Sequence, residues 1–462
     1  MTIQPNSPAA RDVAYMIHPY TNLKAHEESG PMIIVRGEGC YVYDDSGKKY
    51  LEGLAGLWSA SLGFSVDRLT KAATKQMETL PYYHTFAHKS HLPGIDLAEK
   101  LIGLAPAQMA KVFFANSGSE ANDTAIKLIW YYNNARGRHH KKKIIGRVEG
   151  YHGVTIASAS LTGKAVNHKG FDLPIANIIH TSNPHYYKNG LEGESEEEFA
   201  TRMADELEQL ILDEGPDTVA AFFAEPIQGA GGVIVPPKTY FEKIQAVLKK
   251  YDVLFVADEV ICGFGRTGNM WACETFDLKP DMLVCAKALS SSMLPISACM
   301  ISEDMYEPIA NASADLGVLG HGYTYSAHPV CAAVALETLK IYEDDDIIGH
   351  VRSVAPLFQE RLAAFESHAL VGESRGRGLV GALELVQDKA TKKGFEPAGM
   401  VGALVGKFAM ERGLMLRPIV DAVCVCPPLV INESEINELF DKLSGALDDT
   451  LAHLTAEGQA VA

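Results

Sequence analysis

Two short apolar runs, at residues 253–256 and 282–285, each precede a charged residue, and this pattern constrains the fold most strongly. Continuous apolar runs of this length are typical of parallel strands that are buried on both faces. Asp258 and Lys287 follow the two runs, so we expect them at the carboxyl ends of strands. Ligands of open α/β sheets bind at that edge. The sequence therefore predicts an α/β sheet with a carboxylate and an amine at its ligand-binding edge.

Further β–α units bring more polar residues to the same edge. The strands and helices predicted for these units span residues 112–114, 123–134, 143–148, 198–212, 218–224 and 238–250. Ser119, Tyr151 and Glu225 each follow one of these strands. Alone, Asp258 could be a helix cap or turn residue, and Lys287 could be a solvated side chain. The convergence of all these residues on one edge is hard to explain by structure alone, and it favours a binding site.

The residue types at this edge indicate pyridoxal 5'-phosphate (PLP). That cofactor needs a carboxylate beside its pyridinium nitrogen and a lysine that forms a Schiff base with its aldehyde. Its phosphate needs an anion cradle, and the small residues 115–122 lie between a strand and a helix, where free backbone N–H groups favour an anion. Ser117 and Glu120 can also form a capping box, and both interpretations can hold together.

Two glycine motifs suggest other functions. Gly263, Gly265 and Gly268 form a G-x-G-x-x-G pattern, but no amphipathic helix follows and two acids precede it, so we reject a dinucleotide site. Residues 372–376 form a G-x-S-x-G pattern, which is typical of a hydrolase when a strand precedes it and a helix follows it. A strand is predicted after this motif instead, at residues 379–385. Hydrolase activity is therefore the alternative from a different class.

Composition excludes several partners. The net charge of −17 argues against nucleic acid and anionic membranes, and no apolar run approaches the length of a membrane span. No secretory signal is evident, and the eight cysteines include no C-x-x-C pair, so we expect reduced thiols, no metal site and a cytoplasmic protein. Residues 1–30 are polar, and we expect an irregular arm. Arg417 lies in an apolar run, where it could clamp a carboxylate or form a structural ion pair.

Four sequence segments together resemble the class III PLP-dependent aminotransferases. They are DEVICGFGRTG, AKALS, NSGSEAND and EPIQGAGG, and the resemblance extends from about Arg36 to the C-terminal helix. Within that family GLW, YYHTF, EGYHG, HGYTYSAHP and LRPI look most like the ω-amine:pyruvate transaminases. The resemblance implies the fold-type I architecture, with a large domain built on a mostly parallel seven-stranded sheet flanked by helices and a smaller α+β domain.

It also implies a domain division and an oligomeric state. Residues 1–65 would form the N-terminal arm and part of the small domain, residues 66–328 the large PLP-binding domain, and residues 329–462 the rest of the small domain. The family forms homodimers with shared active sites, and a tetramer is an open alternative.

The resemblance assigns roles to individual residues. Lys287 and Asp258 are expected to be catalytic: Lys287 forms the Schiff base and moves the substrate proton, and Asp258 keeps the ring nitrogen protonated. The residues expected to bind the cofactor are Ser117, Gly118, Ser119, Tyr151, His152, Glu225, Gln228, Asp258, Val260, Lys287 and Thr324 of the partner subunit. The residues expected to bind substrate are Trp58, Phe86, Ala87, Tyr151, Ala230 and Arg417.

The implied reaction passes an amino group from an amine donor to PLP, giving pyridoxamine 5'-phosphate, and then to pyruvate, giving alanine. A 4-aminobutyrate or β-alanine transaminase, or a racemase or lyase of the same fold, remains an alternative. Ala87 and Met293 stand where relatives often have other residues, aromatic ones among them. The small Ala87 side chain predicts a pocket that accepts bulkier amines than relatives do.

Overall fold

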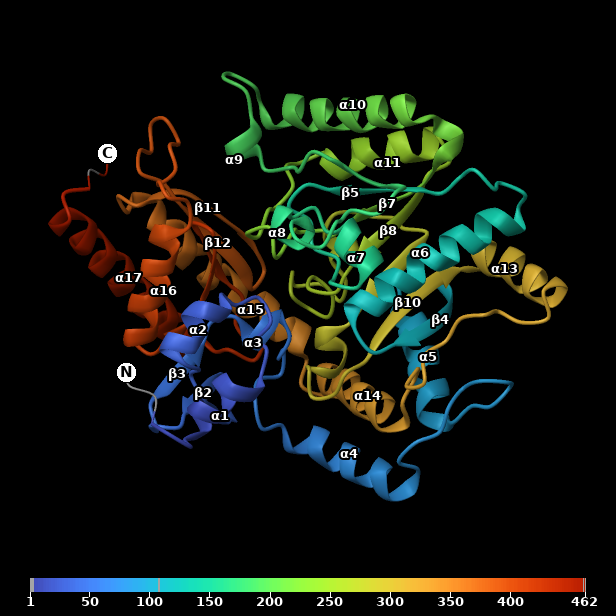
Figure 1. Ribbon diagram of the computed structural model, residues 1–462, viewed down its shortest axis with the longest axis horizontal. Coiled ribbons are helices and arrows are strands. Elements are labelled where there is room, and N and C mark those ends of the chain that lie inside the picture. The colour runs from blue at the N-terminus through green and yellow to red at the C-terminus, as the bar shows by residue number, and fades with distance from the viewer. Residues whose placement is uncertain (1–3, 107–108, 460, 462) are drawn as a thin grey trace.

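The computed structural model describes residues 4–106, 109–459 and 461, and its centre is a seven-stranded sheet (Figure 1). The sheet order is β4-β10-β9-β8-β7-β5-β6. The bounds of these strands are Met109–Ala115, Ser297–Ser302, Met282–Cys285, Leu254–Asp258, Val219–Ala224, Lys143–Arg147 and Ile178–Thr181, respectively. Only β10 runs antiparallel to its neighbours, so the prediction of a mostly parallel seven-stranded sheet is confirmed.

The apolar runs explain which strands lie at the centre. Every residue of β7 and β9 is buried, as expected for parallel strands that are covered on both faces. Because β4, β5, β7, β8 and β9 run in the same direction, their carboxyl ends meet at one edge. That edge carries Asp258 as the last residue of β8, and Lys287 two residues after β9.

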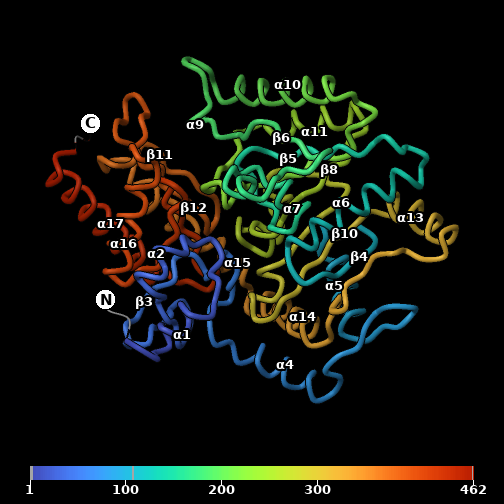
Figure 2. The backbone as a smooth tube through the Cα atoms, viewed as in Figure 1, coloured from blue at the N-terminus to red at the C-terminus, as the bar shows by residue number. Residues whose placement is uncertain are grey.

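Helices cover both faces of this sheet (Figures 1 and 2). One face packs against α6 (Gly118–Ala135) and α13 (Glu303–Asp315), and the other packs against α10 (Glu196–Glu214) and α11 (Tyr240–Lys250). The sequence predicted that the helix after β4 begins at residue 123, but α6 begins at Gly118. Ser117 caps it by accepting a hydrogen bond from the Glu120 backbone N–H at 3.2 Å, so the small residues form its first turn.

Two four-stranded sheets lie beside the large one. The first has the order β1-β2-β3-β13, with bounds Ile34–Glu38, Tyr41–Asp44, Lys49–Glu52 and Leu414–Met415. The second has the order β11-β12-β15-β14, with bounds Val371–Arg377, Val380–Leu385, Ala422–Val425 and Arg417–Ile419. Strand β3 pairs in parallel with β13, so the blue N-terminal and red C-terminal segments lie side by side in Figure 1.

This pairing supports the domain division that we propose, with a small domain built from residues 1–65 and 329–462 around a large domain of residues 66–328. The boundary at residue 329 coincides with the start of α14 (Pro329–Asp344). That helix packs on α4 (Asp67–Thr79) and α5 (Leu92–Leu104), so it would connect the two proposed domains.

The N-terminal arm differs from the prediction of an irregular segment. It contains α1 (Pro8–Tyr15) and α2 (Leu23–Ser29), which are capped by the side chains of Ser7 and Asn22. The remaining helices are α3 (Ala55–Trp58), α7 (Ile156–Leu161), α8 (Ala165–His168), α9 (Tyr186–Asn189), α12 (Ala272–Thr275), α15 (Ile347–Ala363), α16 (Met400–Glu411) and α17 (Glu433–Ala456), with short 3₁₀ helices at Pro216–Thr218, Lys287–Ser290 and Ala364–Ser367. Within the described ranges, no helix is both long and apolar enough to cross a membrane.

Neither glycine motif forms the structure that its alternative function needs. After Gly268 the chain continues into bends and the four-residue helix α12, so the G-x-G-x-x-G motif does not start the helix of a dinucleotide site. Ser374 lies inside β11, which pairs antiparallel with β12, and its hydroxyl donates to Glu366 at 2.8 Å. A nucleophile elbow requires a sharp turn into a helix, so the hydrolase alternative is wrong.

Candidate active site

A cavity of about 120 Å³ opens at the carboxyl edge of the large sheet. Its walls come from the ends of five elements: β5, β7, β8, β9 and the first turns of α6. The lining residues are Gly118, Ser119, Asn122, Tyr151, His152, Gly153, Glu225, Asp258, Val260, Ile261 and Lys287. The structure therefore brings most of the cofactor residues predicted from the sequence into one place.

Asp258 is buried, and its two carboxylate oxygens have different surroundings. Asn122 Nδ2 donates to Oδ2 at 2.8 Å, and His152 Nδ1 lies 2.7 Å from the same oxygen. Oδ1 accepts a single hydrogen bond, from the Val260 backbone N–H at 3.1 Å. A carboxylate oxygen has more acceptor capacity than this, so Oδ1 can accept a further hydrogen bond from a ligand in the cavity.

Lys287 is half-buried and begins the 3₁₀ helix after β9 with a backbone φ of +50°. Residues other than glycine rarely adopt a positive φ. Where they do, the strained backbone is often part of a functional site. Burial lowers the pKa of Lys287, although the charges of Asp258 and Glu225 partly oppose this effect. Among the described residues, no hydrogen-bond or ion-pair partner holds its amine, so Nζ is available as a nucleophile or a base.

Glu225 organises the loop that carries Tyr151. Its Oε1 accepts a hydrogen bond from the Tyr151 backbone N–H at 2.9 Å, and Oε2 accepts one from the Gly229 N–H at 3.0 Å. Burial raises the pKa of Glu225, which His152 partly opposes. Burial also raises the pKa of Tyr151, and the Tyr20 hydroxyl adds to this rise, so the phenol stays neutral at physiological pH.

The start of α6, which also lines the cavity, can hold an anion. Gly118 and Ser119 provide the first N–H groups of α6, where the helix dipole favours negative charge. A Cβ atom on Gly118 would lie 3.2 Å from Val260 Cγ1, and one on Gly153 would overlap Ser119 Oγ. Gly153 also has a φ of +128°, and Ser119 Oγ accepts the Val154 N–H at 3.1 Å. Glycine at both positions keeps this cradle open.

These groups fit PLP. The amine of Lys287, the carboxylate of Asp258 and the N–H groups of α6 supply what its aldehyde, ring nitrogen and phosphate need. Tyr151 and Val260 line the same cavity. The fit rests on the position and chemistry of these groups around one cavity.

Several predicted cofactor residues do not line the cavity. Ser117 instead caps α6, and the buried amide of Gln228 donates from Nε2 to the Val148 carbonyl at 2.9 Å. Thr324 is exposed, and its carbonyl accepts a hydrogen bond from the Tyr82 hydroxyl. Ser117 and Gln228 therefore support neighbouring elements within this chain.

The predicted substrate residues also lie outside the cavity lining, except Tyr151. Trp58 is 3% exposed and packs in the same apolar cluster as the cavity residue Ile261. The carbonyl of Ala230 accepts a hydrogen bond from Lys164 at 3.0 Å. Phe86 and Ala87 are exposed, and Phe86 lies against Gly322.

Arg417 lies in β14, and no carboxylate of the described residues lies within ion-pair distance of it. The structural ion pair left open by the sequence is therefore not formed. Its guanidinium carbon is 5.8 Å from the ring centroid of Tyr20, and its charge lowers the pKa of Tyr151 slightly against the effect of burial. The guanidinium is thus available to an anion near the cavity.

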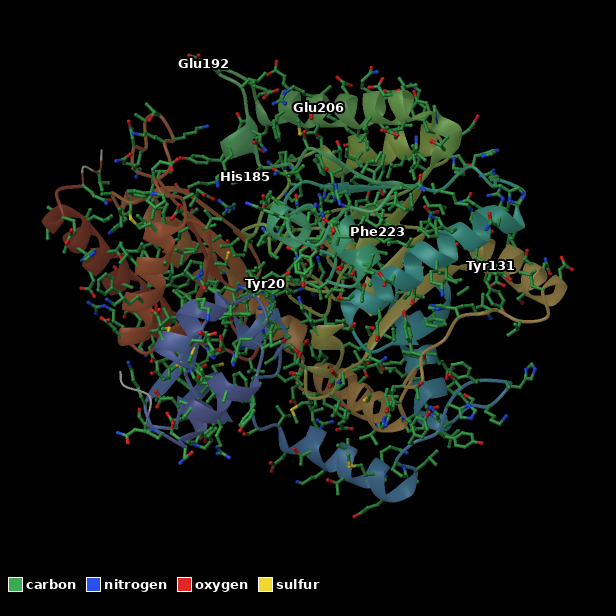
Figure 3. All side chains as sticks on the ribbon, in the orientation of Figure 1. Tyr20, Tyr131, His185, Glu192, Glu206 and Phe223 are labelled. Carbon is green, nitrogen blue, oxygen red and sulfur yellow. The ribbon has the colours of Figure 1, made fainter. Side chains whose placement is uncertain are left out.

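The sequence did not identify the lining residues Asn122, Gly153 and Ile261, or Tyr20, which lies beside Arg417. Asn122 lies inside α6, where nothing in the helical pattern distinguishes it from a surface residue. Tyr20 belongs to the arm, and Figure 3 places it where the arm meets the rest of the chain. The Tyr20 hydroxyl accepts a hydrogen bond from Asn167. The available signal for Tyr20 was the group of aromatic residues in an otherwise polar segment.

Comparison with known proteins agrees with this geometry. The family described as aminotransferase class-III matches residues 23–447. A tomato (Solanum lycopersicum) protein named gamma aminobutyrate transaminase 3, chloroplastic, is 51% identical over 436 residues, which cover 94% of this chain and 84% of that protein.

Solved structures are similar over nearly the whole chain. The omega transaminase of Pseudomonas jessenii in complex with PMP has a TM-score of 0.96 at 55% identity, covering 97% of this chain and 99% of that one. A thermostable omega transaminase variant carrying W58M, F86L and R417L, engineered for asymmetric synthesis of enantiopure bulky amines, has the same TM-score and identity and covers 97% and 100%. This chain therefore belongs to the class III aminotransferases: it is a PLP-dependent transaminase of fold-type I.

Proposed function

We propose that this transaminase moves an amino group from an amine donor to pyruvate, giving a ketone or aldehyde and alanine. The observation that carries the proposal is Arg417, which stands close to the cavity beside Tyr20 without a carboxylate partner in the described chain. A free guanidinium can bind the carboxylate of a keto acid through two hydrogen bonds. Because no ion pair fixes it, the same side chain can move aside for a donor that lacks a carboxylate.

The residues around the cavity have separate tasks. PLP, when bound, supplies an electron sink for the carbon that carries the migrating nitrogen. Asp258 Oδ1 would hold a proton on the ring nitrogen, and Asn122 and His152 fix the carboxylate through Oδ2. The amine of Lys287 removes the proton from the substrate carbon, and its lowered pKa leaves more of it in the basic form. Gly118 and Ser119 bind the phosphate through the first turn of α6.

We assign the substrate pocket to Trp58, Phe86, Ala87, Tyr151, Ala230 and Arg417. The contact of Trp58 with the Ile261 cluster beside the cavity supports its place there. The engineered omega transaminase for bulky amines carries substitutions at positions with the same residue types and numbers as Trp58, Phe86 and Arg417 here. This supports a pocket whose size is set by those three side chains.

A second copy of the chain completes this site in our proposal. Phe86, Ala87 and Thr324 are exposed and do not line the cavity of their own chain. Tyr82 and Tyr325 lie beside them with ring centroids 6.0 Å apart, and both rings are more than a third exposed. An exposed aromatic surface of this kind favours a subunit interface. We therefore propose a homodimer with shared active sites, and the eight buried free thiols support a cytoplasmic location.

A specific observation favours a second candidate, a 4-aminobutyrate transaminase. The tomato relative bears that name, and Arg417 could equally bind the carboxylate of an ω-amino acid. A single-turnover experiment separates the two. The purified holoenzyme is mixed with 1-phenylethylamine or 4-aminobutyrate without an acceptor, and the visible absorbance of the cofactor is followed.

The proposal predicts that 1-phenylethylamine bleaches the visible band and that pyruvate restores it. Bleaching by 4-aminobutyrate alone would reassign the donor class. If the band stays intact with either donor, both proposed donor classes are contradicted.

A further inference from the structure

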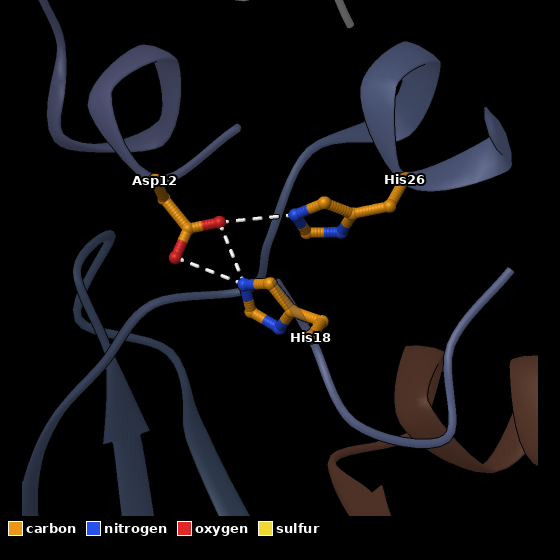
Figure 4. Close-up of side chains that lie close together, drawn as sticks. All are labelled: Asp12, His18 and His26. Carbon is orange, nitrogen blue, oxygen red and sulfur yellow. Dashed lines mark hydrogen bonds and ion pairs between the residues drawn. The ribbon is translucent and has the colours of Figure 1, made fainter. Parts of the chain in front are cut away.

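A group of side chains of the types that ligate metals lies outside the active site, in the N-terminal arm (Figure 4). Asp12 comes from α1, His18 from the link between the two arm helices, and His26 from α2. His18 Nε2 lies 2.8 Å from Asp12 Oδ1 and 3.0 Å from Oδ2, and His26 Nε2 lies 3.0 Å from Oδ1. Two imidazole nitrogens thus converge on one carboxylate oxygen.

This cluster holds together a segment with little apolar packing. In the described part of the arm, residues 4–30, His26 is the only buried side chain. Tyr15, Met16 and Ile17 are all more than half exposed. Small elements that cannot build an apolar core are commonly stabilised by a metal ion or a disulfide. The three polar side chains are therefore the main link between α1, the connecting segment and α2.

The charge of the cluster is not balanced by a permanent cation. Among the described residues, the carboxylate of Asp12 has hydrogen bonds and ion pairs only with His18 and His26, and neither imidazole carries a fixed charge. The exposed fractions of the three side chains are 17%, 25% and 10%, so the group is partly shielded from water. A partly buried carboxylate in this setting favours a cation from solution.

A second cluster in the same chain shows the contrast. His185, Glu373 and Glu384 also lie close together, but Arg375 pairs with both glutamates. Its guanidinium bonds Glu373 at 2.6 Å and Glu384 at 2.8 Å, and Lys188 also pairs with Glu384. The cationic side chains of the protein already neutralise that cluster.

We propose that Asp12, His18 and His26 form a binding site for one divalent transition-metal ion of the Zn²⁺ class, which staples the N-terminal arm. Two imidazoles and one carboxylate are a ligand set that suits Zn²⁺, with water in the fourth position. Zinc ligands lie about 2.0–2.2 Å from the ion, so two ligand atoms of one tetrahedral site are roughly 3.4 Å apart. The three ligand atoms lie within 4.8 Å of one another, so small side-chain rotations make room for the ion.

The proposed metal ion has a consequence for the active site. Tyr20 follows His18 by two residues, accepts a hydrogen bond from Asn167 and lies beside Arg417. An ion that joins the two arm helices holds the segment between them, and so holds Tyr20 against the guanidinium. The site would bind its ion whether or not the proposed donor class is correct.

Metal content tests the proposal directly. The holoenzyme is stripped with a chelator, dialysed against micromolar Zn²⁺, passed through a desalting column and analysed for zinc per subunit. We expect about one equivalent in the wild type, less than a tenth of that in His18→Gln and His26→Gln, and an unchanged value in the control His140→Gln, which alters an exposed histidine elsewhere. Substitution of the wild type with Co²⁺ should give the visible absorption bands of a four-coordinate ion.

Proteolysis provides a second readout that does not depend on a variant's folding. Lys24 is exposed in α2, and we expect Zn²⁺ to slow tryptic cleavage there at least several-fold in the wild type, with no effect at exposed lysines outside the arm. A wild type that retains no zinc and shows no protection would overturn the proposal and leave a clamp made of hydrogen bonds alone. Zinc retained equally by His26→Gln would also overturn it, because the ion would then bind elsewhere.

Discussion

The clearest perturbation of the site is Asp258→Asn, which removes one charge and keeps the shape. Asn122 Nδ2 donates to Oδ2, so the carbonyl oxygen of the new amide must take that position. The amide NH₂ group then replaces Oδ1, where it faces the Val260 N–H and would face the ring nitrogen of the bound cofactor. A donor in that place cannot hold a proton on the ring nitrogen.

The structure sets the size of the effect. A hydrogen bond to a charged group is worth about 1.5–3 kcal/mol. Its loss weakens cofactor binding by about 10- to 150-fold, at about 1.4 kcal/mol for each factor of ten. The rate of the amine half-reaction should fall further, since the unprotonated ring is a poorer electron sink.

Titration of the apoenzyme with PLP, followed by protein fluorescence, measures the affinity, and stopped-flow absorbance measures the half-reaction. Asp281→Asn is the matched control, because Asp281 also accepts a backbone N–H in the same sheet, from Phe255 at 2.8 Å, but does not line the cavity. An Asp258→Asn enzyme with PLP affinity and half-reaction rate within twofold of the wild type would refute the assignment of Asp258.

Three further predictions follow from single residues. Burial raises the pKa of Glu259 from 4.5 to about 7, so its ionisation should lower the free energy of unfolding by about 3 kcal/mol as the pH rises from about 4.5 to above 7. Glu259→Gln should flatten this dependence in urea titrations at pH 5 and pH 8, and parallel wild-type and variant curves would contradict it. Arg417→Ala should raise KM for pyruvate at least tenfold and leave the half-reaction with 1-phenylethylamine within threefold, whereas an unchanged KM would remove the carboxylate role. Ala87→Phe should lower the ratio of activity on bulky amines to activity on small ones, and an unchanged ratio would show that Ala87 does not widen the pocket.

The sequence predicted the parts of the fold that depend on local pattern. Continuous apolar runs identified the central strands, and charged residues at their ends identified Asp258 and Lys287. These predictions succeed because the burial of a parallel strand depends on its own residues. The α/β class follows from the same runs, whereas the number of seven strands came from the resemblance to the family.

The features that the sequence missed depend on contacts between distant segments. Asn122 and Asp258 are separated by 136 residues, and only the packing of α6 on the sheet brings them together. Tyr20 reaches the site because the arm folds back along the chain, with helices that are set by short polar caps rather than by an apolar stripe. The start of α6 was placed too late because its first two residues, Gly118 and Ser119, have weak helix propensity.

The most direct test of the account is the identity of the lysine that holds the cofactor. The holoenzyme is reduced with borohydride, digested with protease, and mapped by mass spectrometry for the phosphopyridoxyl group. The account predicts that this group is found on Lys287, the lysine that lines the cavity beside Asp258. Modification at any other lysine, with Lys287 unmodified, would contradict it.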